Sequence, residues 1–126
     1  MKSNLDIALL LVRVGLALVF MAHGWEKVSN MQDTIGFFAS ISLPAFVAYA
    51  ITYIELIGGF LMLIGVGTGW AGIALAATMV GSIGMVKLGR GFLGGYEFDL
   101  MLFLSSIAIS LSGAGHYSAM RLFRKK

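Results

Sequence analysis

The chain of 126 residues has no cysteine and a single proline, and it is poor in charge, since Asp, Glu, Lys and Arg make up only 12% of it. The missing thiols exclude disulfide, thiol and iron–sulfur chemistry carried by this chain alone. Scarce charge also excludes a disordered chain and a nucleic-acid-binding module. Soluble domains average roughly 45–50% apolar residues, whereas this chain reaches 59%. Because a soluble domain of this size could not bury so much apolar surface, the composition predicts an integral membrane protein.

Four apolar stretches are long enough to cross a bilayer, whose hydrocarbon core of about 30 Å requires about 20 helical residues. The segment after the first stretch contains Gly36-Phe37-Phe38 and is amphipathic, which is typical of a short helix lying in the membrane interface. The sequence therefore predicts one all-α domain over residues 1–126, a transmembrane four-helix bundle with a short interfacial helix between the first two spans. The predicted spans cover about residues 5–23, 44–65, 70–86 and 96–111.

The basic residues predict the orientation, because Lys and Arg are enriched in the cytoplasmic connections of membrane proteins. Arg13 interrupts the first span, which also lacks a small-residue cleavage site, so we expect this helix to be retained. We expect a multi-pass protein of the bacterial inner or plasma membrane with both termini in the cytoplasm. The side of the termini holds Lys2, Arg121, Arg124, Lys125 and Lys126, and the other side holds only Lys27, Lys87 and Arg90.

Two charged residues, Arg13 and Glu55, fall inside predicted spans. Counted along ideal helices, Arg13 lies about 12 Å above the inner edge and Glu55 about 16 Å below the outer edge, so both come near the midplane. Because a lone charge at this depth is costly, the two levels predict a buried ion pair between Arg13 and Glu55. Such a pair would serve either as a structural clamp between two helices or as part of a ligand or proton site.

Beyond Arg13, one face of the first span carries Phe20, Gly24 and Lys27 in that order toward the outer interface. They supply an aromatic ring, a gap without a side chain and a cation. A histidine lies beside the outer end of this face, and the last connection adds a phenol and a carboxylate on the same side of the membrane. These groups suit a quinone head group or small anion with proton exchange toward water; a salt-bridged loop face and plain helix packing remain open. The candidate ligand-binding residues are Phe20, His23, Gly24, Lys27, Tyr96 and Glu97.

No catalytic residue is assigned, and no metal site is predicted. His23 and His116 lie on opposite sides of the membrane in the predicted topology, and the sequence contains no array of histidines and carboxylates with metal-ligand spacing. The glycine-rich segment 89–95 lacks the Lys-Ser/Thr pair of a phosphate-binding loop. Quinone is therefore the one cofactor that the residues suggest.

Many of these residues belong to a wider pattern that extends over nearly the whole chain and resembles the DoxX family of small four-helix bacterial membrane proteins. Two positions depart from that pattern: Gly69, where the family often has arginine, and Met120, where it often has aspartate. The matching residues are Arg13, Phe20, His23-Gly24-Trp25 and Lys27, then Gly36-Phe37-Phe38 and Pro44, then Glu55-Leu56, Gly58-Gly59, Gly65 and Thr68, then Gly91-Phe92 and Gly95-Tyr96-Glu97, and finally Gly113, Gly115 and Tyr117-Ser118.

The resemblance implies membrane redox chemistry, since relatives are subunits of thiosulfate:quinone oxidoreductase or quinol oxidase systems, or components of oxidative-stress complexes. It predicts a quinone-linked membrane redox subunit or an oxidative-stress accessory protein, and it leaves open whether the chain is itself an enzyme. The expected partners are membrane lipid and either a redox subunit or a second copy of the chain; nucleic acid is not expected. The alternative is a non-enzymatic membrane scaffold or a protein that binds a small molecule or lipid.

Overall fold

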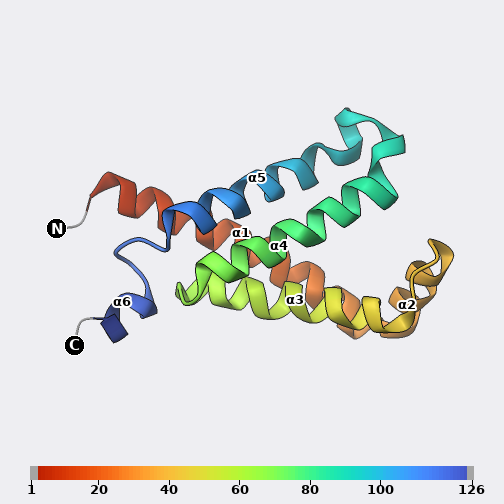
Figure 1. The fold of residues 1–126 in the computed structure, drawn as a ribbon, viewed down its shortest axis with the longest axis horizontal. Helices are drawn as coiled ribbons and strands as arrows, with labels where there is room; N and C mark the ends of the chain where they lie inside the picture. Colours follow the sequence, from red (N-terminus) through yellow and green to blue (C-terminus); the bar gives the residue numbers. More distant parts are fainter. Residues whose placement is uncertain (1–2, 125–126) are drawn as a thin grey trace.

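The computed structural model describes residues 3–124, with side chains for residues 3–121, and all regular structure in this part of the chain is helical (Figure 1). Four helical segments are long and apolar enough to cross a membrane. The prediction of an all-α bundle of four spans with a short helix after the first is confirmed. The four segments are Asn4–Ser29, Ala45–Ile64, Thr68–Arg90 and Phe92–Ser112.

The first helix, α1 (Asn4–Ser29), continues past the predicted end of its span near residue 23. Its start is fixed by a capping box in which the Ser3 hydroxyl accepts from the Asp6 N–H and the Asp6 carboxylate accepts from the Ser3 N–H. The polar residues that follow residue 23 are unfavourable in hydrocarbon, but none of them is a proline that would break a helix. The extra turns place Lys27 within reach of the Glu55 carboxylate.

The short helix α2 (Met31–Ser40) connects α1 to α3 (Ala45–Ile64) and packs against both. It lies at the end of the bundle far from the two ends of the chain (Figure 1). Its Phe38 side chain is buried while Phe37 stays half-exposed, which fits the predicted amphipathic helix at an interface.

After a turn through Gly65 and Gly67, both with left-handed backbone, α4 (Thr68–Ser82) returns along α3. It continues without a break through a π turn and a 3₁₀ turn to Arg90, and the chain direction then changes at Gly91, whose φ is +79°. The third helical segment thus extends past the predicted end of its span near residue 86, and the non-helical backbone before the last span is limited to Gly91, Leu93 and Gly94. These turns and the remaining helices are η1 (Ile83–Lys87), η2 (Leu88–Arg90), η3 (Phe92–Tyr96), α5 (Glu97–Ser112) and α6 (Ala119–Arg124).

The bundle is built from two closely packed pairs, α1 with α3 and α4 with α5, joined where α3 meets α4 (Figure 1). Glycines let the backbones approach. A Cβ on Gly59 would lie 2.8 Å from the Cγ of Met21, and a Cβ on Gly72 would lie 2.5 Å from the backbone oxygen of Ser106. Large apolar side chains that face outward, among them Leu18 and Ile57, form the surface that lipid would cover.

Candidate functional site

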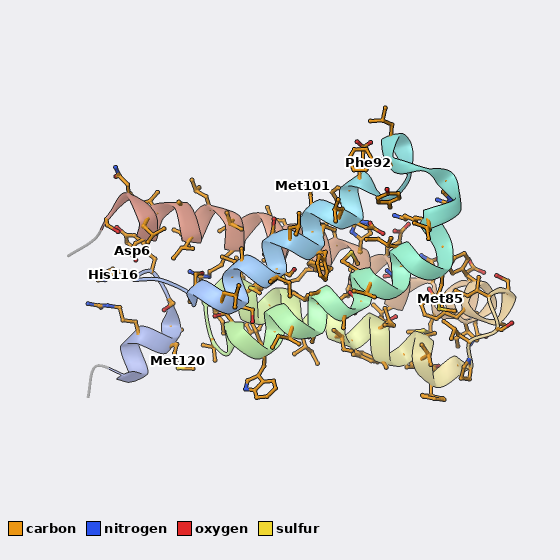
Figure 2. All side chains as sticks on the ribbon, turned by 45° about the horizontal axis from the view of Figure 1, so that its top comes forward. Asp6, Met85, Phe92, Met101, His116 and Met120 are labelled. Atoms are coloured by element: carbon orange, nitrogen blue, oxygen red, sulfur yellow. The ribbon has the colours of Figure 1, made fainter. Side chains whose placement is uncertain are left out.

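A cavity of about 720 Å³ lies at the end of the bundle far from both termini, enclosed by α1, α2, α3, α4 with its π turn, and α5. We call it the distal chamber. Figure 2 shows one of its lining residues, Met85, at this end, and Asp6 and His116 at the opposite end. Its apolar walls include the buried side chains of Phe20, Phe38, Met79 and Leu102, together with Phe37 and Phe98.

An ion pair between Lys27 and Glu55 forms one polar edge of the distal chamber. The Lys27 Nζ lies 2.8 Å from the Glu55 Oε1, and the Glu55 side chain is only 4% exposed, against 25% for that of Lys27. The lysine comes from the turns of α1 beyond residue 23 and the carboxylate from the middle of α3. A buried carboxylate is therefore neutralised by a cation that still reaches the chamber.

A second ion pair, between Lys87 and Asp99, lines the chamber from α5 and the π turn after α4. The Lys87 Nζ lies 3.1 Å from the Asp99 Oδ1, and the Ser82 hydroxyl donates to the Asp99 Oδ2 at 2.5 Å. The Asp99 side chain is as buried as that of Glu55, at 4% exposed. Both carboxylates thus use some of their acceptor sites on protein donors, and both ammonium groups retain N–H donors beyond their ion pairs.

His23 lies on the exposed side of the chamber. Its Nδ1 donates to the backbone oxygen of Val19 at 2.7 Å, which places the hydrogen of the neutral ring on Nδ1 and leaves Nε2 as an acceptor. The ring centroid lies 6.2 Å from that of Phe98. The chamber therefore combines apolar walls and two lysine–carboxylate pairs with an exposed imidazole, and the exposed charged residues Glu26, Asp33 and Arg90 also line it.

The predicted ion pair between Arg13 and Glu55 is wrong. Glu55 pairs with Lys27, and Arg13 donates instead to the backbone oxygens of Met62 and Leu63 at the end of α3. Glu55 and Met62 are seven positions apart, which is about 10 Å along a helix. The depth estimate failed because α1 ends at Ser29 rather than near residue 23, so the two helices pack in a different register.

Arg13 instead ties the end of α3 to the chain that follows α5. Its Nε donates to Met62 and its Nη2 to Leu63, at 2.9 and 3.0 Å. Its Nη1 donates to the backbone oxygens of Ala114 and Tyr117, at 3.0 and 2.7 Å. The side chain is 1% exposed, and the carbonyl end of a helix carries partial negative charge. A buried cation is thus held by carbonyl dipoles, far from the distal chamber.

The other predicted ligand-binding residues divide into two groups. Phe20 and Lys27, from the predicted face of the first span, line the distal chamber, and so does His23, which was predicted beside that face. Gly24 does not, because it is buried against α3, where a Cβ would lie 2.7 Å from the Leu56 Cγ. Tyr96 and Glu97 also lie outside the lining: the Tyr96 ring packs edge-on against Phe92, with centroids 5.4 Å apart, and the Glu97 Oε1 accepts from the Gly94 N–H at 2.8 Å.

Several lining residues carried no clear sequence signal. Asp99 follows a glycine-rich turn and could be taken for a surface acid, and Ser82 looks like an ordinary small residue of a membrane helix. The contribution of α2, with Phe37 and Phe38, depends on that helix folding over the end of the bundle. Among the residues that the structure describes, no three His, Asp or Glu side chains come together as a metal site.

The comparisons with known proteins agree on a membrane family. The DoxX family model matches residues 8–88. The chain is 45% identical to the Bacillus subtilis protein named "Putative oxidoreductase CatD", covering 90% of this chain and 85% of that protein. It is 26% identical to the Escherichia coli inner membrane protein YqjF, covering 100% and 99% of the two chains.

A third relative is the uncharacterized membrane protein Rv3486 of Mycobacterium tuberculosis, which is 32% identical over 91% of this chain and 80% of that protein. No solved structure matches the chain. The family match extends from α1 to the start of η2 and so includes most of the chamber's lining. The chain belongs to the DoxX family of membrane proteins.

Proposed function

We propose that this DoxX-family protein is a quinone-linked membrane redox subunit whose distal chamber binds the quinone head group. The observation that carries the proposal is the pair of ion-paired lysines, Lys27 and Lys87, lining one largely apolar cavity. The name of the Bacillus subtilis relative, which describes an oxidoreductase, supports redox chemistry in general.

The chamber fits a quinone by size and by chemistry. Its volume of about 720 Å³ lies within the roughly 300–1,000 Å³ typical of small-molecule pockets. A quinone ring is flat and apolar with two carbonyl acceptors on opposite edges. The aromatic walls suit the ring, and the remaining N–H donors of Lys27 and Lys87 suit the two oxygens.

A bound quinone supplies a redox couple in which two electrons and two protons are exchanged. Lys27 and Lys87 would orient the ring by hydrogen bonds, and their carboxylate partners, Glu55 and Asp99, would hold the two ammonium groups in place. His23, with its free Nε2 on the exposed side, would exchange those protons with solvent. Because the sequence has no cysteine, no thiol of this chain takes part, and we propose that electrons come from a partner subunit.

We also propose the orientation in which both termini face the cytoplasm of a bacterial plasma membrane. The ends of the described chain lie at the same end of the bundle (Figure 1), as four spans require. The preference for the cytoplasm depends on the basic residues near the termini. Lys2, Lys125 and Lys126 lie outside the described residues, so this orientation stays a prediction.

The experiment that tests the quinone site is a binding titration of the purified protein with a short-chain ubiquinone or menaquinone. Gly81 lines the chamber, and a Cβ there meets no atom within 4 Å, so Gly81→Leu places a side chain in the cavity without a backbone clash. We expect saturable binding to the wild type and a dissociation constant raised about tenfold or more in Gly81→Leu, since the steric conflict costs at least about 1.4 kcal/mol.

Gly84→Leu is the matched control, because Gly84 has the same open surroundings three residues further on but does not line the chamber. Absence of saturable binding, or equal binding to the wild type and to Gly81→Leu, would rule out the site. A further outcome is that quinone binds, yet membranes containing the protein reduce it no faster than membranes without the protein. That result would identify a non-enzymatic quinone-binding protein instead of a redox subunit.

A further inference from the structure

A second cavity, of about 470 Å³, lies at the opposite end of the bundle from the distal chamber. We call it the proximal cavity. It is enclosed by the turn between α3 and α4 and by the segment that follows α5. The residues that matter to its chemistry are Thr68 and Gly69 at the start of α4 and Arg121 in α6. Nothing in the proposed quinone site depends on this cavity.

The N-terminus of α4 opens into the proximal cavity without a protein cap. Gly67 precedes the helix with left-handed backbone, and no side chain accepts from the first turn. The earliest N–H donated to a backbone oxygen there is that of Ala71, to Gly67. The N–H groups of Thr68 and Gly69, both of which line the cavity, thus have no acceptor among the described residues. A helix start with free N–H groups carries partial positive charge and favours an anion.

The side chain of Thr68 gives an independent indication of a ligand. The residue is only 5% exposed, yet it lines the proximal cavity. Its hydroxyl makes no hydrogen bond to any residue that the structure describes. The side chain is thus buried apart from its hydroxyl, which opens into the cavity, where a ligand oxygen could accept from it.

The charge around the proximal cavity is positive. Its described lining includes the cation Arg121 and no carboxylate, and Arg121 takes part in no ion pair within the described residues. Behind Gly65 lies the Arg13 guanidinium, whose four partners are all neutral carbonyl oxygens. Asp6 lies beside Gly115 of the lining, and its carboxylate already accepts from the N–H groups of Ser3 and His116. One guanidinium group and a helix start therefore face the proximal cavity, a second guanidinium lies behind Gly65, and no carboxylate is among the described lining residues.

We propose that the proximal cavity binds a phosphate group, held by the first N–H groups of α4, the Thr68 hydroxyl and the Arg121 guanidinium. Phosphate oxygens match all three donors, and guanidinium groups bind phosphate by paired hydrogen bonds. The adjacent Trp70 is 82% exposed, which is typical of a tryptophan at the membrane interface. The phosphate is then either that of an anionic phospholipid head group or a free phosphate from the water phase.

The test measures binding of two probes to the purified full chain: phosphatidylglycerol, counted by native mass spectrometry, and inorganic phosphate, titrated by calorimetry. We expect Arg121→Gln to raise the dissociation constant about tenfold or more, because a charged hydrogen bond is lost. Thr68→Val should raise it about fivefold, because a neutral hydrogen bond is lost. Thr52→Val is the matched control, since the Thr52 hydroxyl is buried in α3 and donates to Ala48, away from the cavity.

Gly69→Asp separates a lost site from a lost fold. A Cβ on Gly69 meets only the backbone oxygen of Ser110, at 3.9 Å, so an aspartate fits and offers its own carboxylate to the start of α4. We expect this variant to lose binding while its melting temperature is unchanged or higher.

Binding of phosphatidylglycerol with no response to inorganic phosphate identifies the lipid head group, and the reverse identifies free phosphate; both support the site if the variants weaken binding as expected. Failure of both probes to bind, or binding that is indifferent to Arg121→Gln and Gly69→Asp, overturns the proposal. The quinone titration is unaffected by either result, because the two cavities lie at opposite ends of the bundle (Figure 2).

Discussion

Replacing Arg13 by Met is expected to lower the free energy of unfolding by about 4 kcal/mol, because four backbone oxygens lose their donor at about 1 kcal/mol each. Met keeps most of the side-chain volume but donates no hydrogen bond. The oxygens are those of Met62 and Leu63 at the end of α3, and of Ala114 and Tyr117 after α5. Unfolding in mixed detergent micelles, followed by circular dichroism, measures the change.

Two further variants sharpen this test. Arg13→Lys keeps the charge but cannot reach all four oxygens, so it should recover only part of the loss. The effects of Arg13→Met and Glu55→Gln should add in the double variant to within about 0.5 kcal/mol, as expected for residues that do not touch. A larger coupling energy would indicate a direct interaction between Arg13 and Glu55, which the structure excludes.

Replacing Lys27 by Met is expected to cost about 3–5 kcal/mol, because it leaves the Glu55 carboxylate buried without a cation. The Glu55 side chain is 4% exposed and accepts from Lys27 at 2.8 Å. The reverse variant, Glu55→Gln, should cost less, since the Lys27 side chain is 25% exposed and its ammonium can turn toward water.

The double variant Lys27→Met with Glu55→Gln should recover part of the loss, since no unpaired charge is left in the bundle. The same unfolding measurement on the two single variants and the double variant gives the coupling energy. Strict additivity of the two changes would show that the ion pair does not contribute to the folded state.

The membrane fold could be predicted because it follows from average properties of long segments. A bilayer requires about 20 apolar residues for each helix, and four such stretches stand out whatever their partners are. The limits of α1 could not be predicted in the same way. Gly24 to Lys27 look too polar for a span, yet Gly24 is buried against Leu56 and Lys27 turns inward to Glu55. Tertiary contacts decided the end of that helix.

The lining of the distal chamber could be predicted in part from one helix, but not where it depends on contacts between several. Phe20 and Lys27 share a face of α1 and line the distal chamber, whereas Gly24 on the same face packs against Leu56. The partners of Arg13 and Glu55 depend on the register between α1 and α3, and a change of a few residues exchanges one partner for another. Lys87 lies at the end of the π turn after α4, where it meets Asp99 of α5, and this pairing depends on how two helices pack.

The two cavities differ in a way that bears on their proposed ligands. The distal chamber neutralises each of its two buried carboxylates with a lysine, and its other charged lining residues, Glu26, Asp33 and Arg90, are exposed, so its buried part suits a neutral ring. The proximal cavity has a cation and a bare helix start with no described carboxylate in its lining, so an anion is favoured. The same fold thus offers a site for a neutral molecule at one end and for a charged one at the other.

Photolabelling of the wild-type protein in lipid nanodiscs with an azidoquinone, followed by mass spectrometry of its peptides, locates the bound ring. The label should appear on the walls of the distal chamber, at Phe37 and Phe38 in α2 and at Met79 in α4, and both excess unlabelled quinone and Gly81→Leu should suppress it. Label confined to lipid-facing side chains such as Leu18 and Ile57, with no competition by unlabelled quinone, would contradict quinone binding in the chamber.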